Sequence, residues 1–457
     1  MKLLILIPMV FLLAAGCGTE IGPDPTGDGP ESRALLESRL RLAGEYLESG
    51  RVDSAARIFR EIRESDPESA EAAAGLTRVY LLTGRNAEAI RMGRTAVRLD
   101  PRRAQAWEDL GKAQAREGRR EDAVWSLRKA AQLQPDNPVY QNELGAALGR
   151  LGDYGEAIAA LTRAVELDPE YPEALNNLGM AHFRDGDPER AEKFLRRALE
   201  ARPGYARAHL NRAIVFRERG ENEAALESLD RALRSDPGLI PAYDLAGAIH
   251  FQEGRFEEAA EAYREIIDRN PDFAPAYVRL GEVALQRGED AEAVRMFEEA
   301  IALAPREPAS YALLSRARMR RKEYDRAGTA ILWALNLDPD NPDYYRRAGE
   351  LFLAQDRWRE AENALTRARD LDPENPEIFL ELGNLYLHIR QPGQARQALA
   401  RAVELDPGGE AGLQARRELD RLEGAEKPTP NSEPGRGDHF WEAIFDRLEI
   451  SPRPEEE

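Results

Sequence analysis

Apolar and small residues recur along most of this chain with the period of an α-helix. In residues 172–186 they are Leu175, Leu178, Gly179, His182 and Phe183. They return at intervals of three and four positions, so they share one side of a helix. Residues 187–203 repeat this spacing with Ala191, Phe194, Leu195, Ala198 and Leu199. The pattern predicts two helices, each with one apolar face.

Glycine and proline mark where these helices end. Gly186 predicts a turn, because glycine enters left-handed backbone without a steric penalty from a Cβ atom. Asp187 is placed to cap the second helix, and Pro188 suits its first position. Pro203 ends that helix, since its ring disfavours helical backbone in the preceding residue. One unit is therefore predicted to be a helix, a tight turn and a helix.

The same unit recurs eleven times without insertion or deletion. A proline stands every 34 residues, at Pro67, Pro101, Pro135, Pro169, Pro203, Pro237, Pro271, Pro305, Pro339, Pro373 and Pro407. An alanine stands twelve residues before each proline, and a small residue, most often glycine, stands 24 residues before it. We expect the small residue to face the alanine and to let the two helices approach closely. One hairpin cannot cover its own apolar face, so the units must stack.

The unit resembles the tetratricopeptide repeat. The resemblance rests on Trp107, Leu110, Gly111, Ala123, Leu127, Ala130 and Pro135, and on Tyr277, Leu280, Gly281, Ala293, Phe297, Ala300 and Pro305. It implies an all-α fold, a right-handed α-solenoid of eleven 34-residue helix-turn-helix repeats over residues 36–409. It also implies that the first helices line a concave groove that binds peptides or proteins. An amphipathic stretch at residues 410–423 is expected to be a capping helix.

Five positions depart from the family pattern. The turn glycine is replaced by Lys322, Asp356 and Arg390 in the last three repeats. Arg39 and Ala73 stand where an aromatic residue is usual. These departures lie toward the two ends of the array.

The first sixteen residues differ in kind from the repeats. Lys2 precedes an apolar run from Leu3 to Ala15, which is shorter than the ~20 residues of a membrane span and typical of a secretory signal. The run ends Leu13-Ala14-Ala15-Gly16-Cys17, which resembles a bacterial lipobox. The resemblance implies that residues 1–16 are removed and that Cys17 is acylated. The alternative is ordinary cleavage after Gly16, which leaves a free thiol.

The lipobox resemblance also predicts a location. Residues 17–35 become a lipid-attached tether, and the protein is anchored in the cell envelope, facing the periplasm. Gly18 follows the cysteine where an aspartate would favour the inner membrane, so the outer membrane is favoured.

The chain after residue 423 contains one further apolar pattern. Residues 424–438 are rich in Pro, Gly and Ser and predict a linker, and residues 451–457 form an acidic tail. Between them, residues 439–450 predict an amphipathic helix with Phe440, Trp441, Ile444, Phe445 and Leu448 on one stripe. This helix either folds back on the last repeats or docks a partner through Phe440, Trp441, Ile444 and Phe445.

Composition and motifs narrow the function. The chain has 64 Lys and Arg against 83 Asp and Glu, a net charge of −19, which argues against nucleic acid as a partner. Cys17 is the single cysteine, so no internal disulfide can form. The sequence has no GxxxxGK[ST], GxSxG, HExxH or CxxC motif, and it predicts neither an enzyme nor a cofactor or metal. His182 and His250 share a column with aromatic residues, so we expect them to pack and not to bind metal.

Polar residues of the predicted first helices form the one site-like pattern. Arg116, Arg150 and Arg184 stand 19 residues before successive prolines, with Arg78 and Lys112 in a similar setting. Asn142 and Asn176 share one column, and Asn177 and Asn211 share the next. By the family geometry these columns face the groove, where asparagine can bond a peptide backbone and arginine a carboxylate. Such a site would suit an acidic or C-terminal segment. The alternative is that the arginines only complement helix dipoles.

We therefore expect a non-enzymatic scaffold that binds proteins or peptides for envelope assembly, secretion or pilus biogenesis. The expected attachment to the membrane is the lipid on Cys17. The alternative function is an accessory or activator subunit of a polysaccharide or peptidoglycan enzyme.

Overall fold

The computed structural model describes residues 30–426, and this range contains 23 helices and no strands. The first helices of the repeats are α1 (Pro30–Glu48), α3 (Ala70–Leu82), α5 (Ala104–Arg116), α7 (Pro138–Leu151), α9 (Pro172–Arg184), α11 (Ala206–Glu218), α13 (Ile240–Gln252), α15 (Ala274–Gln286), α17 (Pro308–Arg320), α19 (Pro342–Leu353) and α21 (Pro376–His388). The second helices are α2 (Val52–Ser65), α4 (Asn86–Leu99), α6 (Arg120–Leu133), α8 (Tyr154–Leu167), α10 (Pro188–Ala201), α12 (Asn222–Ser235), α14 (Phe256–Arg269), α16 (Asp290–Leu303), α18 (Tyr324–Leu337), α20 (Trp358–Leu371) and α22 (Pro392–Leu405). A final helix, α23, spans Glu410–Glu426.

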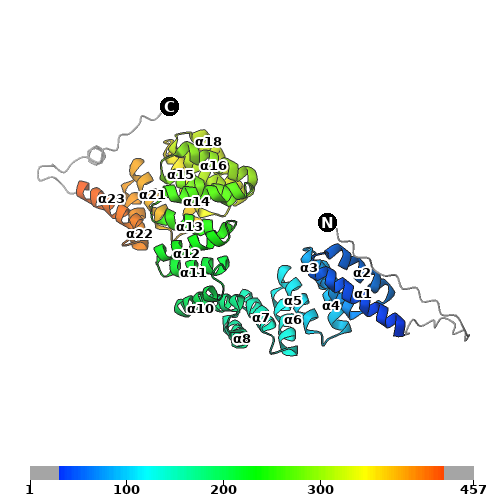
Figure 1. Ribbon diagram of the computed structural model, residues 1–457. Coiled ribbons are helices and arrows are strands. Elements are labelled where there is room, and N and C mark those ends of the chain that lie inside the picture. The colour runs from blue at the N-terminus through cyan, green and yellow to red at the C-terminus, as the bar shows by residue number, and fades with distance from the viewer. Residues whose placement is uncertain (1–29, 427–457) are drawn as a thin grey trace, which may run out of the picture. The chain divides into compact units, whose positions relative to one another are not determined.

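The helices form a solenoid of hairpins in two compact units (Figure 1). Unit 1 is Met1–Val215 and unit 2 is Phe216–Glu457, so the boundary falls within α11. In each unit the two helices of a repeat pack on each other, and the second helix packs on the first helix of the next repeat. The predicted all-α solenoid is confirmed.

The ends of the predicted helices follow the local chemistry of the sequence. The Asp187 carboxylate caps α10 by accepting a hydrogen bond of 2.9 Å from the backbone N–H of Arg190. Pro188 occupies the first turn of that helix, and α10 ends at Ala201, two residues before Pro203. These features were all predicted from the residue types.

Each hairpin turns through one residue with left-handed backbone. In the first eight repeats this residue is a glycine, such as Gly118 with φ of 79°. The last three repeats keep the same turn with Lys322, Asp356 and Arg390 at φ of 60°, 57° and 58°. A Cβ atom in this region costs about 1–2 kcal/mol. The substitutions noted in the sequence therefore leave the turn unchanged and store strain in it.

The small residue of the first helix contacts mainly a large side chain of the second helix. A Cβ atom added to Gly111 would lie 2.6 Å from Leu127 Cγ and 3.2 Å from the carbonyl oxygen of Ala123. In the repeat with a serine at this position, Ser315 Oγ donates a hydrogen bond of 2.9 Å to the carbonyl oxygen of Ala327. The expected contact with the alanine is thus made with its backbone, and the nearest side chain is the one eight residues before the proline.

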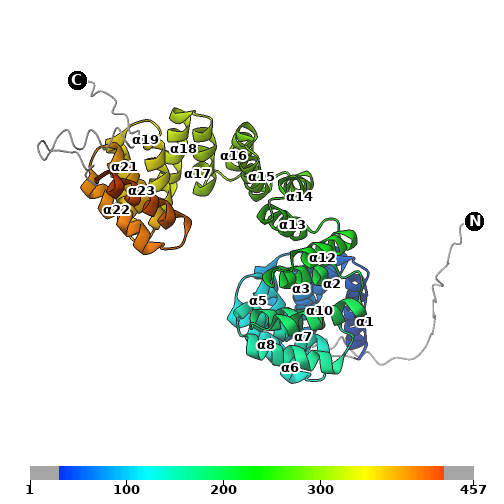
Figure 2. The ribbon, with the colours of Figure 1, turned by 90° about the vertical axis from the view of Figure 1, so that its left-hand side faces the viewer.

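Two predicted boundaries differ from the structure. The tether was expected to reach residue 35, but α1 begins at Pro30, because Pro30 suits a first helical position and helix-forming residues follow it. The capping helix was expected to end at residue 423, but α23 continues to Glu426 and shortens the predicted linker. Ala411, Ala415 and Leu422 of α23 are buried in the core of the last repeats, where the helix lies against α21 and α22 (Figure 2).

No helix within residues 30–426 is both long and apolar enough to cross a membrane.

The strained turns predict that glycine stabilises unit 2. Lys322→Gly should raise the free energy of unfolding by about 0.5–1 kcal/mol, because release of the left-handed strain exceeds the greater freedom of glycine in the unfolded chain. Urea denaturation followed by circular dichroism measures the change. Lys322→Ala is the control, since it removes the lysine side chain but keeps the Cβ atom. An equal gain in both variants would show that the backbone is not the cause.

Candidate functional site

Two adjacent columns of the first helices carry much of the buried polar chemistry. They stand 27 and 26 residues before the repeat prolines. In unit 1 they hold Glu108, Asp109, Asn142, Glu143, Asn176, Asn177 and Asn211. In unit 2 they include Arg346, Arg347 and Glu381. The register of the repeat therefore brings polar residues from successive repeats into contact.

The four predicted asparagines form one chain of hydrogen bonds across α7, α9 and α11. Asn177 Nδ2 donates to Asn142 Oδ1 at 2.9 Å, and Asn211 Nδ2 donates to Asn176 Oδ1 at 2.8 Å. Asn176 Nδ2 joins the two pairs by donating to Asn177 Oδ1 at 3.3 Å. Sequence reasoning found the columns but did not anticipate that their members bond each other across a repeat.

Burial divides the asparagines into two groups. Asn142 and Asn176 are only 4% and 2% exposed, and they hold Asn177 and Asn211 in place by accepting their hydrogen bonds. Asn177 and Asn211 are half-buried and form the accessible edge of the chain. Binding of a partner by these side chains stays a prediction, and this edge is where it would occur.

Helix α5, which precedes the helices of the asparagine chain, carries two adjacent acidic residues, Glu108 and Asp109, in the same columns. Lys112 Nζ lies 2.5 Å from Glu108 Oε1 and 3.6 Å from Glu143 Oε1, so the predicted groove lysine is held by two carboxylates. Burial opposes the charge of the lysine, but Glu143 and Glu108 raise its pKa. Lys112 is therefore paired with Glu108 and Glu143 and is not a free cation.

Asp109 is the least satisfied member of this cluster. The residue is 4% exposed, and its Oδ2 atom is buried without a hydrogen-bond partner. Gln105 Nε2 donates to the other oxygen at 3.3 Å, and Arg78 Nε lies 3.8 Å from Oδ2, beyond hydrogen-bond distance. Burial and the neighbouring Glu108 raise the pKa of Asp109 to about 7. A donor brought to Oδ2 would therefore stabilise the ionised carboxylate.

A hollow of about 400 Å³ lies beside this carboxylate, among α1, α3 and α5. Its lining includes Leu40, Gly44, Gly75, Arg78 and Asp109. Gly44 contributes to this space, because a Cβ atom added to it would meet nothing within 4 Å. Sequence analysis missed Asp109 and this hollow, although the glycine at position 44 was a signal for the hollow.

Of the predicted arginine stripe, Arg116, Arg150 and Arg184, one member bonds the backbone of the preceding repeat. Arg116 Nη1 donates a hydrogen bond of 2.6 Å to the carbonyl oxygen of Leu81, in the last turn of α3. Arg320 does the same at 2.7 Å to Leu285 of α15. These arginines complement the helix of the preceding repeat, which extends the dipole interpretation across repeats. Arg150 and Arg184 are exposed at the ends of α7 and α9, and the Arg184 guanidinium lies 5.9 Å from the ring centre of Phe183.

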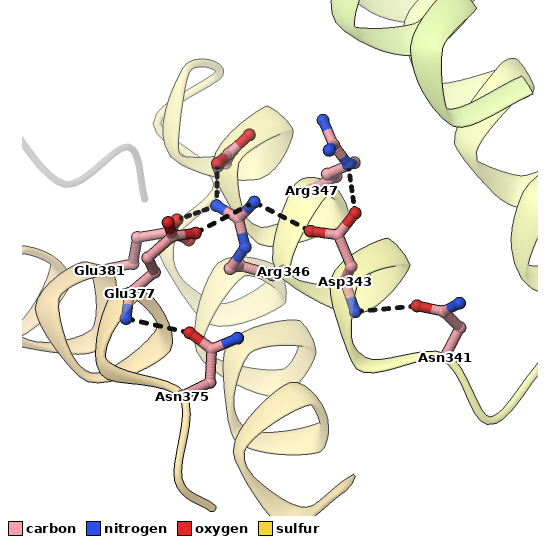
Figure 3. A network of polar contacts seen from close by, with 8 residues as sticks. Asn341, Asp343, Arg346, Arg347, Asn375, Glu377 and Glu381 are labelled. Atoms are coloured by element: carbon pink, nitrogen blue, oxygen red, sulfur yellow. Dashed lines mark hydrogen bonds and ion pairs between the residues drawn. The ribbon is translucent and has the colours of Figure 1, made fainter. Parts of the chain in front are cut away.

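Unit 2 contains a second polar cluster, centred on Arg346, that sequence analysis did not identify (Figure 3). The guanidinium lies between Asp343 at 2.9 Å on one side and Glu381 at 2.7 Å and Glu377 at 3.4 Å on the other (Figure 3). Glu350 completes the cluster at 2.5 Å. Arg347 Nε binds the other oxygen of Asp343 at 2.7 Å.

The Arg346 cluster joins α19 to α21 and has no free cation to offer a ligand. Burial opposes the charge of Arg346, but Glu381 and Glu350 raise its pKa. Burial and Glu350 raise the pKa of Glu381. Removing one partner from such a cluster is strongly destabilising, because the remaining charges stay buried. We therefore interpret the Arg346 cluster as structural.

His182 packs as expected, and His250 is partly buried. His182 is buried and stacks on Phe194, with ring centres 5.4 Å apart. Burial and the nearby Arg190 lower the pKa of His182, and burial and Arg255 lower that of His250. Within residues 30–426, no group of three or more His, Cys, Asp or Glu side chains is placed to hold a metal ion. Cys17, Phe440, Trp441, Ile444 and Phe445 lie outside the described residues.

Comparisons with family models match nearly the whole array. Models of the tetratricopeptide repeat match residues 46–107, 84–138, 142–206 and 186–240. A model of the cilia and flagella-associated protein 70 C-terminal domain matches residues 238–433. No curated protein matches the chain.

Solved structures of repeat proteins are also similar to this chain. YrrB, described as a TPR protein with an unusual peptide-binding site, is 26% identical, with 41% of this chain and 96% of YrrB covered and a TM-score of 0.34. Yeast Tom70 is 14% identical, with 92% of this chain and 100% of Tom70 covered and a TM-score of 0.42. PilF of Pseudomonas aeruginosa is 23% identical, with 55% of this chain and 98% of pilF covered and a TM-score of 0.38.

The raised pKa of Asp109 predicts how stability depends on pH. The folded protein holds a proton on Asp109 up to pH ~7, whereas the unfolded chain loses it near pH 4, so this residue costs stability as pH rises between those values. Asp109→Asn should therefore raise the free energy of unfolding by roughly 1–3 kcal/mol at pH 8 and have little effect at pH 4. Urea denaturation at both pH values tests this. Asp136→Asn, at an exposed carboxylate of the same unit, should change little at either pH. A gain from Asp109→Asn that does not depend on pH would contradict the assignment.

Proposed function

The chain is a tetratricopeptide repeat protein, a scaffold for protein–protein interaction, and on that premise we propose that unit 1 binds an extended segment of a partner protein along its first helices. The observation that carries the proposal is the buried Asp109 Oδ2 atom, which has no hydrogen-bond partner, beside a hollow of about 400 Å³ among α1, α3 and α5. A bound segment fills the hollow and donates a hydrogen bond to this oxygen. The half-buried edge of the asparagine chain, Asn177 and Asn211, continues the surface along α9 and α11.

The lining of the hollow favours a hydrogen-bond donor or a cation on the bound segment. Three carboxylates line it, those of Glu37, Glu71 and Asp109, together with two arginines. The two arginines are Arg78 and Arg103, and Arg103 already binds Glu71 at 2.7 Å. An acidic or C-terminal segment, which the arginine stripe suggested, is therefore less suited to this part of unit 1 than a lysine, arginine or backbone N–H donor.

We further propose that the protein is a lipoprotein, held on the periplasmic side of the cell envelope. The support is the single cysteine directly after an apolar run of signal-peptide length. Acylation of Cys17 would fix the array to a membrane, with the outer membrane favoured. The scaffold would then recruit proteins for envelope assembly, secretion or pilus biogenesis.

A photo-crosslinking amino acid at Gly44 tests the groove. This position lies at the hollow and has open space for a side chain, so the probe should capture a partner protein in cells. Gly155, on the second helix α8, also has open space and is the matched control. We expect a discrete crosslinked partner from Gly44 at least ten times above that from Gly155, and a large loss when Asp109→Asn is added. Equal capture from both positions would contradict the groove assignment.

The substitution Cys17→Ser tests the anchor separately. It should move the protein from the membrane fraction to the soluble fraction and remove the mass of the lipid. The helical content of the array should not change, because the cysteine precedes the first helix. Retention in the membrane pellet with an unchanged mass would show that the chain is not lipid-anchored through this residue.

A further inference from the structure

The second notable hollow lies in unit 2, among α18, α19 and α20, and has a volume of about 570 Å³. Ile331, Leu332 and Leu335 line it from α18, and Leu351 and Phe352 line it from α19. Its size is within the range of pockets that hold several ring-sized groups. The lining is mostly apolar, so an apolar occupant would gain from leaving water there.

Gly328 of α18 is one of the residues that line the hollow and leaves space in it. Gly328 stands eleven residues before its repeat proline, where four other repeats have Ile90, Val124, Ile158 and Val294 and the remaining six have Leu, Ala, Glu or Arg. Three of these, Ile90, Val124 and Val294, are buried. A Cβ atom added to Gly328 would touch only Leu351 Cδ2, at 3.6 Å. This glycine therefore leaves open a space that a buried Ile or Val fills in three other repeats.

The same repeat exposes apolar residues in columns that are polar in nearly all of the other repeats. Leu332 stands seven residues before its proline, where the other repeats have Arg60, Arg94, Arg128, Thr162, Arg196, Asp230, Arg264, Glu298, Thr366 and Ala400. Trp333 stands in the next column, where every other repeat has a charged residue or a threonine. Leu332 and Trp333 are 64% and 52% exposed. Leu332 also lines the hollow, whereas Trp333 stacks on Tyr311 with ring centres 6.2 Å apart. An exposed apolar side chain that continues an apolar hollow indicates a surface that binds an apolar group.

We propose that the chain's own residues 439–450 cover this surface, with Trp441, Ile444 and Phe445 entering the hollow. The sequence predicts an amphipathic helix there, and its apolar stripe matches a groove between two helices. The polar side of this segment carries Glu442, Asp446, Arg447 and Glu449. Arg367 lines the hollow, 3.8 Å from Asp340 and 5.9 Å from the ring centre of Tyr345, and its ion pair is long enough for it to bind one of these carboxylates instead.

The chain between the last helix and this segment is long enough. Thirteen residues, 427–439, separate Glu426 from Phe440 and span at most about 43–47 Å. Helix α23 packs on α21, and α21 packs on α20, so two interhelical steps of roughly 8–10 Å separate α23 from one wall of the hollow. The length of α20, about 21 Å, adds to this distance and still leaves it within reach.

The tether also favours the chain's own segment over a separate protein. A linker that can span two sites makes the second contact intramolecular, so the tethered segment does not have to be recruited from solution. A separate protein would bear the full cost of association. This docking concerns unit 2 and does not depend on the proposed binding of a partner by unit 1.

Disulfide trapping in the full chain tests the proposal. Since Cys17 is the only cysteine, Cys17→Ser gives a cysteine-free background. In that background Leu332→Cys with Ile444→Cys should form an intramolecular disulfide under mild oxidation. It is detected as a faster-migrating monomer on non-reducing gels and as a loss of two hydrogens by mass. Adding Trp441→Ser and Phe445→Ser should slow the reaction at least tenfold.

Two controls use the same column in the flanking repeats. Thr366→Cys with Ile444→Cys places the thiol on α20, nearer the tether along the chain, and Glu298→Cys with Ile444→Cys places it on α16. Both should react at least tenfold more slowly than the Leu332 pair. Equal rates at all three positions would overturn the proposal, since they would show only a loosely tethered segment. Disulfide-linked dimers that increase with protein concentration would also overturn it, in favour of a second copy as the occupant.

Discussion

The close approach of the two helices in each hairpin is the contact on which the rest of the molecule depends. At Gly111, Gly179 and Gly281 the first helix has no side chain, and a leucine or phenylalanine of the second helix occupies the place of the missing Cβ atom. Where the column holds Ser315, the hydroxyl reaches the carbonyl of the facing alanine instead. This contact fixes the depth and rotation of both helices. The polar columns of successive first helices consequently meet at the same height in neighbouring repeats.

Because the polar columns of neighbouring repeats meet, the residue types in those columns decide the chemistry of each unit. In unit 1 asparagines bond from one repeat to the next, and beside them Asp109 keeps one oxygen without a hydrogen-bond partner. In unit 2 the same columns hold Arg346, whose carboxylate partners lie on α19 and α21. Saturated clusters hold repeats together, whereas an unsatisfied buried oxygen beside a hollow is suited to a ligand. The same solenoid thus contains a structural cluster and a candidate binding site in equivalent positions.

The repeat made most of the fold predictable, because proline, glycine and the apolar period report local backbone and burial directly. The ends were less predictable: nothing in the apolar pattern distinguished the helix that begins at Pro30 from a tether. For the site, the sequence identified the asparagine columns and the arginine stripe. It could not show that Arg116 bonds the carbonyl of Leu81, since that partner lies in the preceding repeat. Asp109 and Arg346 were missed because charged residues on a helix usually lie in solvent, and only packing shows that these two are buried.

The contact in each hairpin can be tested with two valine substitutions in unit 1. In Gly111→Val the Cβ atom would lie 2.6 Å from Leu127 Cγ, whereas in Gly155→Val it would meet nothing within 4 Å. The midpoint of urea unfolding, followed by circular dichroism, measures both. Close approach of the helices predicts that Gly111→Val lowers the apparent free energy of unfolding by about 3 kcal/mol or more and that Gly155→Val changes it little. Equal stability of the two variants would contradict the account.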